Sequence, residues 1–281
     1  MNDLAKRTIS GALFVAIMAF CITFDRITYF CLFWCIMLYG MREFFNISIG
    51  ESMKLQRAMA ILCGLCGFLA VYFLECYAKA SVTLVSVLVS CCFLLLLAIP
   101  ISCIFRQNHE DHGNLSYIYA ALLYIALPIA LSPKLVMDCE VFDGWMLLSL
   151  FIIIWMSDVG AYAIGTALGQ KPDSRKLAPS ISPKKSWWGF WGAVVIGTAT
   201  AVGLHYLTWL PFSLAHCIAV GVIISVGAVC GDLVESMWKR YFHVKDSGNA
   251  IPGHGGVLDR FDSSLIAIPL SCIYLSIFGL I

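Results

Sequence analysis

The chain has 281 residues, of which 60% are hydrophobic and only 12% charged, and its formal net charge is +1. Soluble domains carry about 25% charged residues, so this composition excludes a soluble globular protein and indicates an integral membrane protein. The thirteen cysteines lie nearly all inside apolar runs, where small apolar residues of membrane helices explain them better than a disulfide framework does.

Nine apolar segments follow one another along the chain, and each is close to the length of about 20 residues that a membrane-spanning helix needs. Their approximate limits are 8–24, 27–41, 58–74, 80–104, 115–131, 145–168, 188–208, 212–233 and 261–281. The sequence therefore predicts an all-α, polytopic helical bundle with about nine transmembrane helices. The first segment follows a basic flank like that of a signal peptide, but no Ala-x-Ala-like site follows it, so we interpret it as a retained helix. The second is the shortest, and the first pair could instead form a helical hairpin that does not fully cross.

The sixth, seventh and eighth segments contain glycines, which allow helices to approach one another closely in lipid. These glycines are Gly160, Gly165, Gly192, Gly197, Gly221 and Gly227.

The distribution of basic residues predicts the orientation of the chain. If the N-terminus is cytoplasmic and all nine segments cross, every Lys and Arg except Arg26, Lys79 and Lys134 lies on the cytoplasmic side. The positive-inside rule favours this arrangement over the inverted one. We therefore expect a multi-pass protein of the cell membrane with a cytoplasmic N-terminus and a C-terminus outside.

Two of the expected cytoplasmic loops, 169–187 and 234–260, carry half of all the basic residues. We therefore expect a cytoplasm-facing active site near the C-terminus. The chain is divided accordingly into N-terminal transmembrane helices, 1–144, and a C-terminal catalytic region, 145–281, within one continuous membrane domain.

Asp158 lies well inside the sixth apolar segment, in the stretch SDVGAYAIGTALGQ. An ionisable residue at such depth is energetically expensive and is a functional hypothesis by default. The alternative is a structural aspartate that is hydrogen-bonded to Ser157, Tyr162 or a neighbouring helix.

The stretch from Lys171 to Gly192 has five basic residues and one acidic residue. Within it, Ser182-Pro183-Lys184-Lys185-Ser186 predicts a turn that places two ammonium groups near the start of a helix. Such a place suits a multiply charged anion. The alternative is a basic anchor for anionic lipid head groups.

A third polar stretch runs from Gly231 to Ser264 and contains carboxylates at the ends of two predicted helices. Asp232, Glu235 and Ser236 share one helix face, and Asp259 and Asp262 open the last helix. Paired carboxylates suit Mg²⁺, glycines allow backbone N–H groups to approach phosphate oxygens, and basic side chains neutralise phosphate. The pattern predicts a metal-dependent phosphoryl or nucleotidyl transfer site. The sequence has neither an HExxH motif nor a P-loop motif.

These stretches resemble the signature of the phosphatidate cytidylyltransferase (CDP-diacylglycerol synthase) family. The longest match runs through Ser236-Met-Trp-Lys239-Arg240, Lys245-Asp246, Pro252-Gly-His254-Gly255-Gly256 and Asp259-Arg260-Phe-Asp262. A second block matches as Ser157-Asp158, Ala161-Tyr162 and Ser182 to Lys185. The resemblance covers the chain from about Phe151 onward, and the N-terminal half matches mainly in hydropathy, with Glu43-Phe44 as an echo. The chain departs from the family pattern at Trp188, where Glu is usual, and at Ser186, where Thr is usual.

The resemblance implies that the chain transfers the cytidylyl group of CTP to phosphatidic acid, giving CDP-diacylglycerol and pyrophosphate in phospholipid biosynthesis. It implies Mg²⁺ as the cofactor and leaves a second cation open. The expected partners are CTP, phosphatidic acid, the lipid bilayer and a second copy of the chain in a homodimer, with no nucleic acid. The compact length resembles bacterial members, for which the inner membrane is the expected location.

The resemblance and the residue chemistry together assign roles within the expected site. The expected catalytic residues are Asp232, Asp259, Lys239 and Asp246. The expected metal ligands are Asp232 and Asp259, with Asp262, Glu235 and Asp246 as alternates. The residues expected to bind or line the substrates are Asp158, Ser182, Lys184, Lys185, Lys239, Arg240, Lys245, His254, Gly255, Gly256 and Arg260.

Two other functions remain as alternatives at this point, and a third is excluded. A CTP-dependent kinase of a polyprenol or dolichol would share CTP, metal and membrane but would release CDP. A transporter is compatible with Asp158 and the glycine-bearing helices, although the polar groups are expected at one membrane face and not at the midplane. A CDP-alcohol phosphatidyltransferase requires a DGxxAR…GxxxD…D pattern that the sequence lacks.

Overall fold

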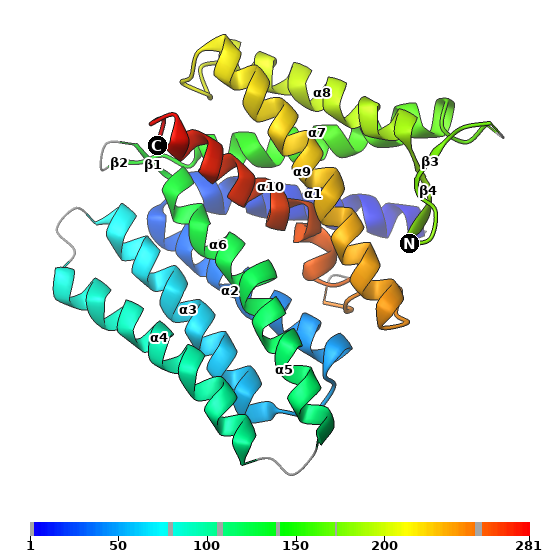
Figure 1. Cartoon of the computed structure of the whole chain (residues 1–281). Coiled ribbons are helices and arrows are strands. Elements are labelled where there is room, and N and C mark those ends of the chain that lie inside the picture. Colours follow the sequence, from blue (N-terminus) through cyan, green and yellow to red (C-terminus); the bar gives the residue numbers. More distant parts are fainter. Residues whose placement is uncertain (1–2, 78–80, 106–108, 139–140, 172, 251–254) are drawn as a thin grey trace. The chain divides into compact units, whose positions relative to one another are not determined.

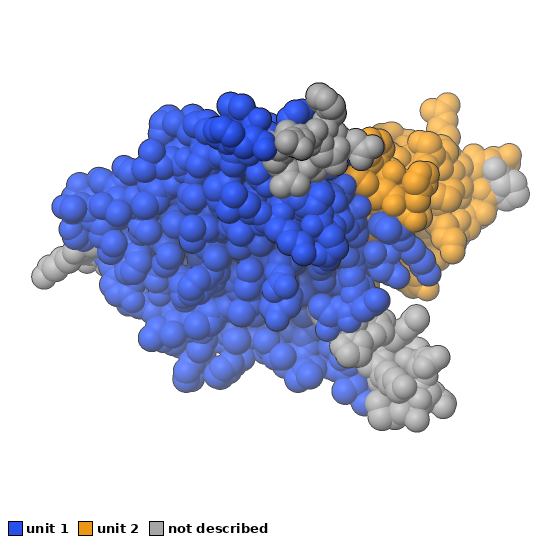
Figure 2. Space-filling view, turned by 90° about the horizontal axis from the view of Figure 1, so that it is seen from below, with its two compact units in different colours: residues 1–143, 244–260 blue, residues 144–243, 261–281 orange. Residues whose placement is uncertain are grey.

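The computed structural model of the chain describes residues 3–77, 81–105, 109–138, 141–171, 173–250 and 255–281 (Figure 1). These residues form two compact units, which Figure 2 distinguishes by colour. Unit 1 comprises residues 1–143 and 244–260, and unit 2 comprises residues 144–243 and 261–281.

Unit 1 is a bundle of apolar helices with one short hairpin. Its elements are α1 (Asp3–Thr23), α2 (Arg26–Ser48), α3 (Lys54–Cys76), α4 (Val82–Ile104), α5 (His109–Ala121), a π-helical turn (Leu122–Ala126), α6 (Leu127–Leu131), a 3₁₀ turn (Ser132–Leu135), β1 (Met137–Asp138) and β2 (Val141–Phe142). Asp25 separates α1 from α2 because its carboxylate accepts a hydrogen bond from the Ile27 amide at 3.1 Å and caps α2. Large aromatic side chains from α2 and α3, including Phe33 and Phe68, are fully buried in the core.

Unit 2 contains four long helices and a short antiparallel ribbon. Its elements are α7 (Trp145–Ala167), β3 (Lys176–Ala178), β4 (Ser182–Ser186), α8 (Trp187–Tyr206), α9 (Leu214–Tyr241) and α10 (Leu258–Ile277), of which the first three residues belong to unit 1. In Figure 1, α7 and α8 run side by side, with α9 next to them. β4 passes directly into α8, so the ribbon is tied to the start of that helix.

Glycines set the close packing of the unit 2 helices, as the sequence predicted. A Cβ added at Gly160 of α7 would lie 2.6 Å from the Gly192 carbonyl oxygen of α8. A Cβ at Gly227 of α9 would lie 3.0 Å from the Ala267 Cα of α10. The backbones therefore approach too closely for any larger residue, which is how small residues bring helices together in lipid.

The structure confirms the polytopic helical fold. Among the described residues, eight helices are long and apolar enough to cross a membrane, and Thr8–Thr23 is a shorter apolar helix. The second expected segment, 27–41, is part of the longer helix α2, which meets the criteria of length and composition. The interpretation of that segment as a full-length helix is therefore favoured over a short hairpin arm.

Two local expectations were wrong. The loop expected from residue 234 begins only after Tyr241, because α9 continues to that residue. Glu235 and Lys239 form an i, i+4 ion pair along it. The turn expected at Ser182–Ser186 is strand β4, which pairs with β3 so that Lys176 faces Ser186. The helix start expected after it is present, because the Ser186 hydroxyl caps α8 by accepting from the Gly189 amide at 3.2 Å.

The packing of α7 on α8 predicts opposite effects for two alanine substitutions in α8. Gly192→Ala would place a Cβ 2.6 Å from the Gly160 carbonyl oxygen and 2.8 Å from the Ile164 Cβ, and overpacking of this kind costs about 1–3 kcal/mol. Gly203→Ala meets nothing within 4 Å and gains up to about 1 kcal/mol of helix propensity. We expect thermal unfolding in detergent micelles to shift downward only for Gly192→Ala. An unchanged midpoint for that variant would show that the close approach does not stabilise the unit.

Candidate active site

Unit 2 contains a cavity of about 610 Å³ that combines charged and apolar walls. Its charged and polar lining residues are Asp158, Tyr162, Thr166, Gln170, Lys184, Lys185, Ser186 and Asp232. Its apolar lining residues include Ala161, Leu177, Phe190 and Val229. A cavity lined by two lysines and by aliphatic and aromatic side chains suits an anion that is attached to an apolar group.

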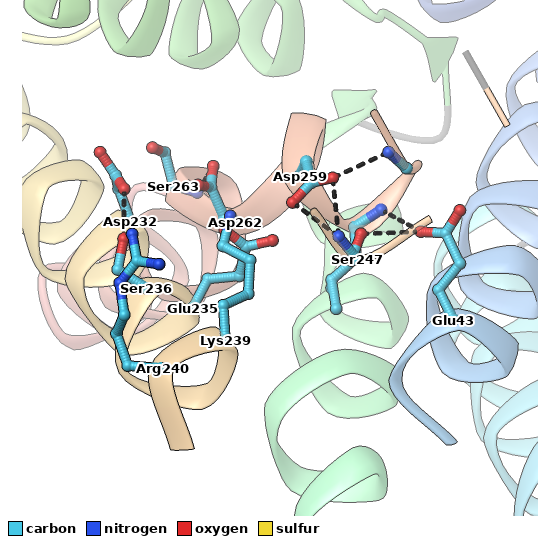
Figure 3. Close-up of polar contacts among 12 residues, drawn as sticks. Glu43, Asp232, Glu235, Ser236, Lys239, Arg240, Ser247, Asp259, Asp262 and Ser263 are labelled. Carbon is cyan, nitrogen blue, oxygen red and sulfur yellow. Dashed lines mark hydrogen bonds and ion pairs between the residues drawn. The ribbon is translucent and has the colours of Figure 1, made fainter. Parts of the chain in front are cut away.

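The charged centre of this cavity is an ion pair between β4 and α9. The Lys185 ammonium group contacts the Asp232 carboxylate. The Ser236 hydroxyl donates to the same carboxylate at 3.3 Å (Figure 3). The side chain of Lys185 is 25% exposed and that of Asp232 is 36% exposed, so both remain accessible to a small ligand. The pair fixes one lysine of the basic strand against the carboxylate of α9.

Asp262 lies near Asp232 because α9 and α10 pack closely at this level. A Cβ at Gly231 would meet the Asp262 carbonyl oxygen and would lie 2.9 Å from the Ser263 Cα. The Asp262 carboxylate is partly buried and accepts from the Ser263 amide at 2.6 Å. The charges of Asp232, Asp158 and Lys239 act on it electrostatically. Unit 2 therefore brings three of the predicted aspartates into one neighbourhood.

Lys239 and Arg240 differ in their availability to a ligand. Lys239 forms an ion pair with Glu235, and their side chains are only 14% and 2% exposed. Arg240 is exposed and donates to the Ile181 carbonyl oxygen at 3.3 Å, which links α9 to the ribbon. The burial of Lys239 and Glu235 supports a structural role for this pair better than direct contact with a substrate.

The ribbon that carries Lys184 and Lys185 is fastened to the end of α7. The side-chain amide nitrogen of Gln170 donates to the Lys184 carbonyl oxygen at 2.9 Å. Lys176 donates to the Gly169 carbonyl oxygen at 2.8 Å and to the Gln170 side-chain oxygen at 3.2 Å. With the Ser186 cap at the start of α8, these bonds hold the middle and the C-terminal end of the basic strand. Ser182 opens the strand and is not one of the cavity-lining residues.

Unit 1 carries a separate polar cluster around the end of the 244–260 segment. Asp259 accepts from the Ser247 amide at 3.0 Å and from the Gly256 amide at 2.8 Å. Ser247 also donates its hydroxyl to Glu43 of α2 at 3.2 Å (Figure 3). Asp259, which we expected to bind a metal, therefore has backbone N–H groups on its carboxylate.

The other predicted residues of this segment have simpler surroundings. Lys245, Asp246 and Arg260 are exposed. Gly255 has a φ of +83°, a conformation that residues with a Cβ rarely adopt. His254 lies outside the described residues. The roles assigned to these residues stay predictions.

Two contributors were missed by the sequence analysis. Gln170 was quoted only as the end of a motif, and Glu43 was noted only as an echo of the family pattern. The available signal for Glu43 was its position as an acid among apolar residues after the second segment. No local pattern indicates that Glu43 contacts a residue more than 200 positions further along the chain.

The carboxylates of unit 2 fit a hard divalent cation that completes its coordination shell with water or substrate oxygens. In the described part of the chain, no three His, Cys, Asp or Glu side chains come together in a way that would hold a metal ion by themselves. Mg²⁺ does not require such a cage, because it commonly keeps several waters and binds through one or two carboxylates plus substrate phosphates. Asp232 and Asp262 supply two such carboxylates.

Comparison with known proteins identifies relatives along the whole chain. The model of the cytidylyltransferase family matches residues 5–278. A phosphatidate cytidylyltransferase of Bacillus subtilis (strain 168) is 30% identical, and the match covers 99% of this chain and 100% of that protein. A protein of the same name from Staphylococcus epidermidis is 41% identical over 120 residues, which are 43% of this chain and 45% of that protein. Another from Rickettsia bellii is 30% identical over 63% of this chain and 77% of its own length.

Proposed function

Because the chain belongs to the cytidylyltransferase family, we propose that it is a phosphatidate cytidylyltransferase whose reaction takes place in the cavity of unit 2. The enzyme transfers the cytidylyl group of CTP to phosphatidate and releases pyrophosphate, which gives CDP-diacylglycerol. The observation that supports this place for the reaction is the Lys185–Asp232 pair inside a cavity that is both cationic and apolar. A soluble nucleotide and a lipid phosphate need such a mixed environment.

The main obstacle to this reaction is repulsion between two anions. An oxygen of the phosphatidate phosphate attacks the α-phosphorus of CTP, a new P–O bond forms, and the P–O bond to the β-phosphate breaks. The nucleophile is already an anion, so the site needs no strong general base. Lys184 and Lys185 reduce the repulsion and stabilise the charge that accumulates on the leaving pyrophosphate.

The protein orients these cations before the substrates arrive. Asp232 keeps Lys185 in one position, Gln170 holds the Lys184 carbonyl group, and Ser186, directly after Lys185, caps α8. A preorganised charge needs no rearrangement when the transition state forms, which is why such groups contribute strongly to rate. The apolar wall at Phe190 and Val229 suits the glycerol and acyl portion of the lipid.

Asp232 and Asp262 are the residues proposed to bind Mg²⁺. The metal, when bound, would neutralise phosphate charge and stabilise the departing pyrophosphate. This assignment replaces Asp259, whose carboxylate accepts two backbone N–H groups in unit 1. Asp232 is a metal ligand both in the assignment expected from the sequence and in the one proposed here.

The protein is a multi-pass membrane protein, and we propose a cytoplasmic N-terminus with the lysine-bearing ribbon on the cytoplasmic side. This orientation follows the positive-inside rule and gives CTP direct access from water. A reporter enzyme that is active only outside the cytoplasm should be active when fused after Ile281. If instead only a reporter that works in the cytoplasm is active after Ile281, the orientation is the opposite of the one proposed. The homodimer that the resemblance implies stays a prediction.

Product analysis tests the proposed reaction directly. Purified protein in detergent, supplied with phosphatidic acid, CTP labelled at the α-phosphate and Mg²⁺, should form a labelled CDP-lipid and pyrophosphate. Chelation of divalent cations should stop the reaction, and added Mg²⁺ should restore it. Release of CDP with a phosphorylated lipid alcohol would support the kinase. Saturable flux into liposomes without any CTP chemistry would support the transporter.

The variant Asp232→Asn tests whether the Asp232 carboxylate is needed for activity or only for folding. The amide keeps the shape of the side chain but removes the charge that pairs with Lys185 and is proposed to bind the metal. We expect the rate to fall at least about a hundredfold with little change in the thermal unfolding midpoint. Asp173→Asn, which changes an exposed acid of the α7–β3 connection, is the matched control and should retain the full rate.

The same rate and unfolding measurements, made on Asp259→Asn, distinguish the role of Asp259 from that of Asp232. Asp259→Asn should also lower the unfolding midpoint. Oδ2 of Asp259 accepts from the Ser247 and Gly256 amides, and Oδ1 accepts from the Ser247 amide at 3.2 Å. In the variant, a neutral amide oxygen accepts more weakly than a carboxylate, and the NH₂ group would face the Ser247 N–H group, which is also a donor. A wild-type rate for Asp232→Asn would remove Asp232 from the active site.

A further inference from the structure

The pairing of β3 with β4 is irregular at the two lysines that line the cavity. The partner pairs are Lys176 with Ser186 and Ala178 with Ser182. Between these pairs β3 has one residue, Leu177, whereas β4 has three, 183–185. Extra residues in one strand disrupt the ladder locally and change the direction of the side chains. The backbone at the two lysines therefore depends on donors from outside the ribbon.

A side chain that follows α7 supplies such a donor. The side-chain amide nitrogen of Gln170 donates to the Lys184 carbonyl oxygen at 2.9 Å. Helix α7 ends at Ala167, with Leu168 as its C-cap, and in Figure 1 the ribbon lies where α7 ends and α8 begins. The irregular part of β4 is therefore held by the end of α7 as well as by β3.

Lys176, at the start of β3, determines which way this amide points. Its ammonium group donates to the Gln170 side-chain oxygen at 3.2 Å and to the Gly169 carbonyl oxygen at 2.8 Å. An ammonium group has donors only, so the amide turns its oxygen toward Lys176 and its NH₂ group toward Lys184. In the absence of Lys176, the amide oxygen could face the Lys184 carbonyl oxygen, and that carbonyl would then lose its donor.

The contacts of Lys176 differ from those of two other lysines in unit 2. Lys185 and Lys239 are each paired with a carboxylate. Lys176 is half-buried, does not line the cavity and forms no ion pair with any residue that the structure describes. Its ammonium group lies instead at the C-terminal end of α7, where the helix dipole favours a cation. Hydrogen bonds from a charged donor are stronger than neutral ones, so Lys176 fastens β3 to the end of α7.

Gly169 brings the end of α7 against the end of β4. A Cβ at Gly169 would overlap the Ser186 hydroxyl and would lie 2.7 Å from the Ser186 Cβ. Gly169 has no positive φ, so space and not backbone conformation explains the glycine. Ser186 directly follows Lys185. The short segment 169–170 therefore contacts β4 on both sides of Lys185, and Lys176 holds both residues of that segment.

We propose that Lys176 is a positioning residue for the reaction: by orienting Gln170 and holding Gly169, it keeps the backbone of Lys184 in place. The inference rests on the proposed function, in which Lys184 and Lys185 bind the reacting phosphates. All of these residues belong to unit 2, as does the cavity. Lys176 itself touches neither substrate in this account. Its loss lets the basic strand move and so weakens the binding of the CTP triphosphate.

The variant Lys176→Met tests this role, because methionine keeps most of the length of the side chain and removes the ammonium group. We expect KM for CTP to rise at least about threefold, as the loss of one hydrogen bond implies. Lys171→Met removes the same charge from an exposed lysine of the α7–β3 connection. It is the matched control and should leave KM unchanged. A wild-type KM in Lys176→Met would overturn the proposal.

A purely structural role for Lys176 would give a different result. Partial misfolding of Lys176→Met lowers the concentration of active enzyme, so the maximal rate falls while KM for CTP stays constant. That combination would show that Lys176 stabilises the fold without positioning Lys184, and it would also overturn the proposal.

A double-mutant cycle tests whether Lys176 acts through Gln170. Gln170→Met removes both the oxygen and the NH₂ group of the amide, so Lys176 has no amide left to orient. Lys176→Met should therefore raise KM for CTP much less in the Gln170→Met background than in the wild-type background. Equal factors in the two backgrounds would contradict the assigned route from Lys176 to Lys184.

Hydrogen exchange distinguishes failure of this inference from failure of the proposed function, because it does not depend on any activity. In Lys176→Met, the backbone amides of residues 176–187 should exchange at least about threefold faster than in the wild-type protein. In Lys171→Met their exchange should not change. Unchanged exchange in Lys176→Met would overturn the positioning role. If exchange is faster in Lys176→Met but the wild-type protein makes no CDP-lipid, the restraint on the ribbon stands and the proposed reaction is overturned.

Discussion

A carboxylate beside apolar helices must be paired with donors, and most of the polar architecture of this protein follows from that constraint. Each unit satisfies it in its own way. In unit 1, Glu43 and Asp259 bind backbone amides and the Ser247 hydroxyl. In unit 2, Asp232 pairs with Lys185, and Glu235 pairs with Lys239. Removing one partner of such a pair leaves a charge in an unfavourable environment, so each carboxylate restrains the segment that supplies its donors.

Glycines make room for close contacts in both units. In unit 2 they allow helix backbones to touch, as at Gly231, where α9 meets the backbone of Asp262. In unit 1 they leave space for a carboxylate, as at Gly248 and Gly256. Phosphate binding is therefore not needed to explain Gly248 and Gly256 of the segment before the last helix. Part of its composition is explained by contacts within the folded protein.

The sequence predicted the helices well because the membrane imposes a simple rule on length and polarity. Lys184 and Lys185 were singled out in one charged stretch and Asp232 in another, and in the structure all three line one cavity. The strand conformation of Ser182–Ser186 was missed because Ser-Pro-Lys-Lys has turn chemistry and its pairing with Lys176–Ala178 is a tertiary contact. Glu43 was missed because its donors are distant in sequence, and no local pattern encodes such a contact.

The central claim is that the lysines and aspartates of the unit 2 cavity bind the reacting phosphates. A structure of the detergent-purified protein with a non-hydrolysable CTP analogue and Mg²⁺ tests it most directly. The account predicts triphosphate oxygens within hydrogen-bonding distance of Lys184 and Lys185, and a cation bonded to Asp232 and Asp262. A triphosphate bound elsewhere, with neither lysine contacting it and neither aspartate bonded to a metal, would contradict the account.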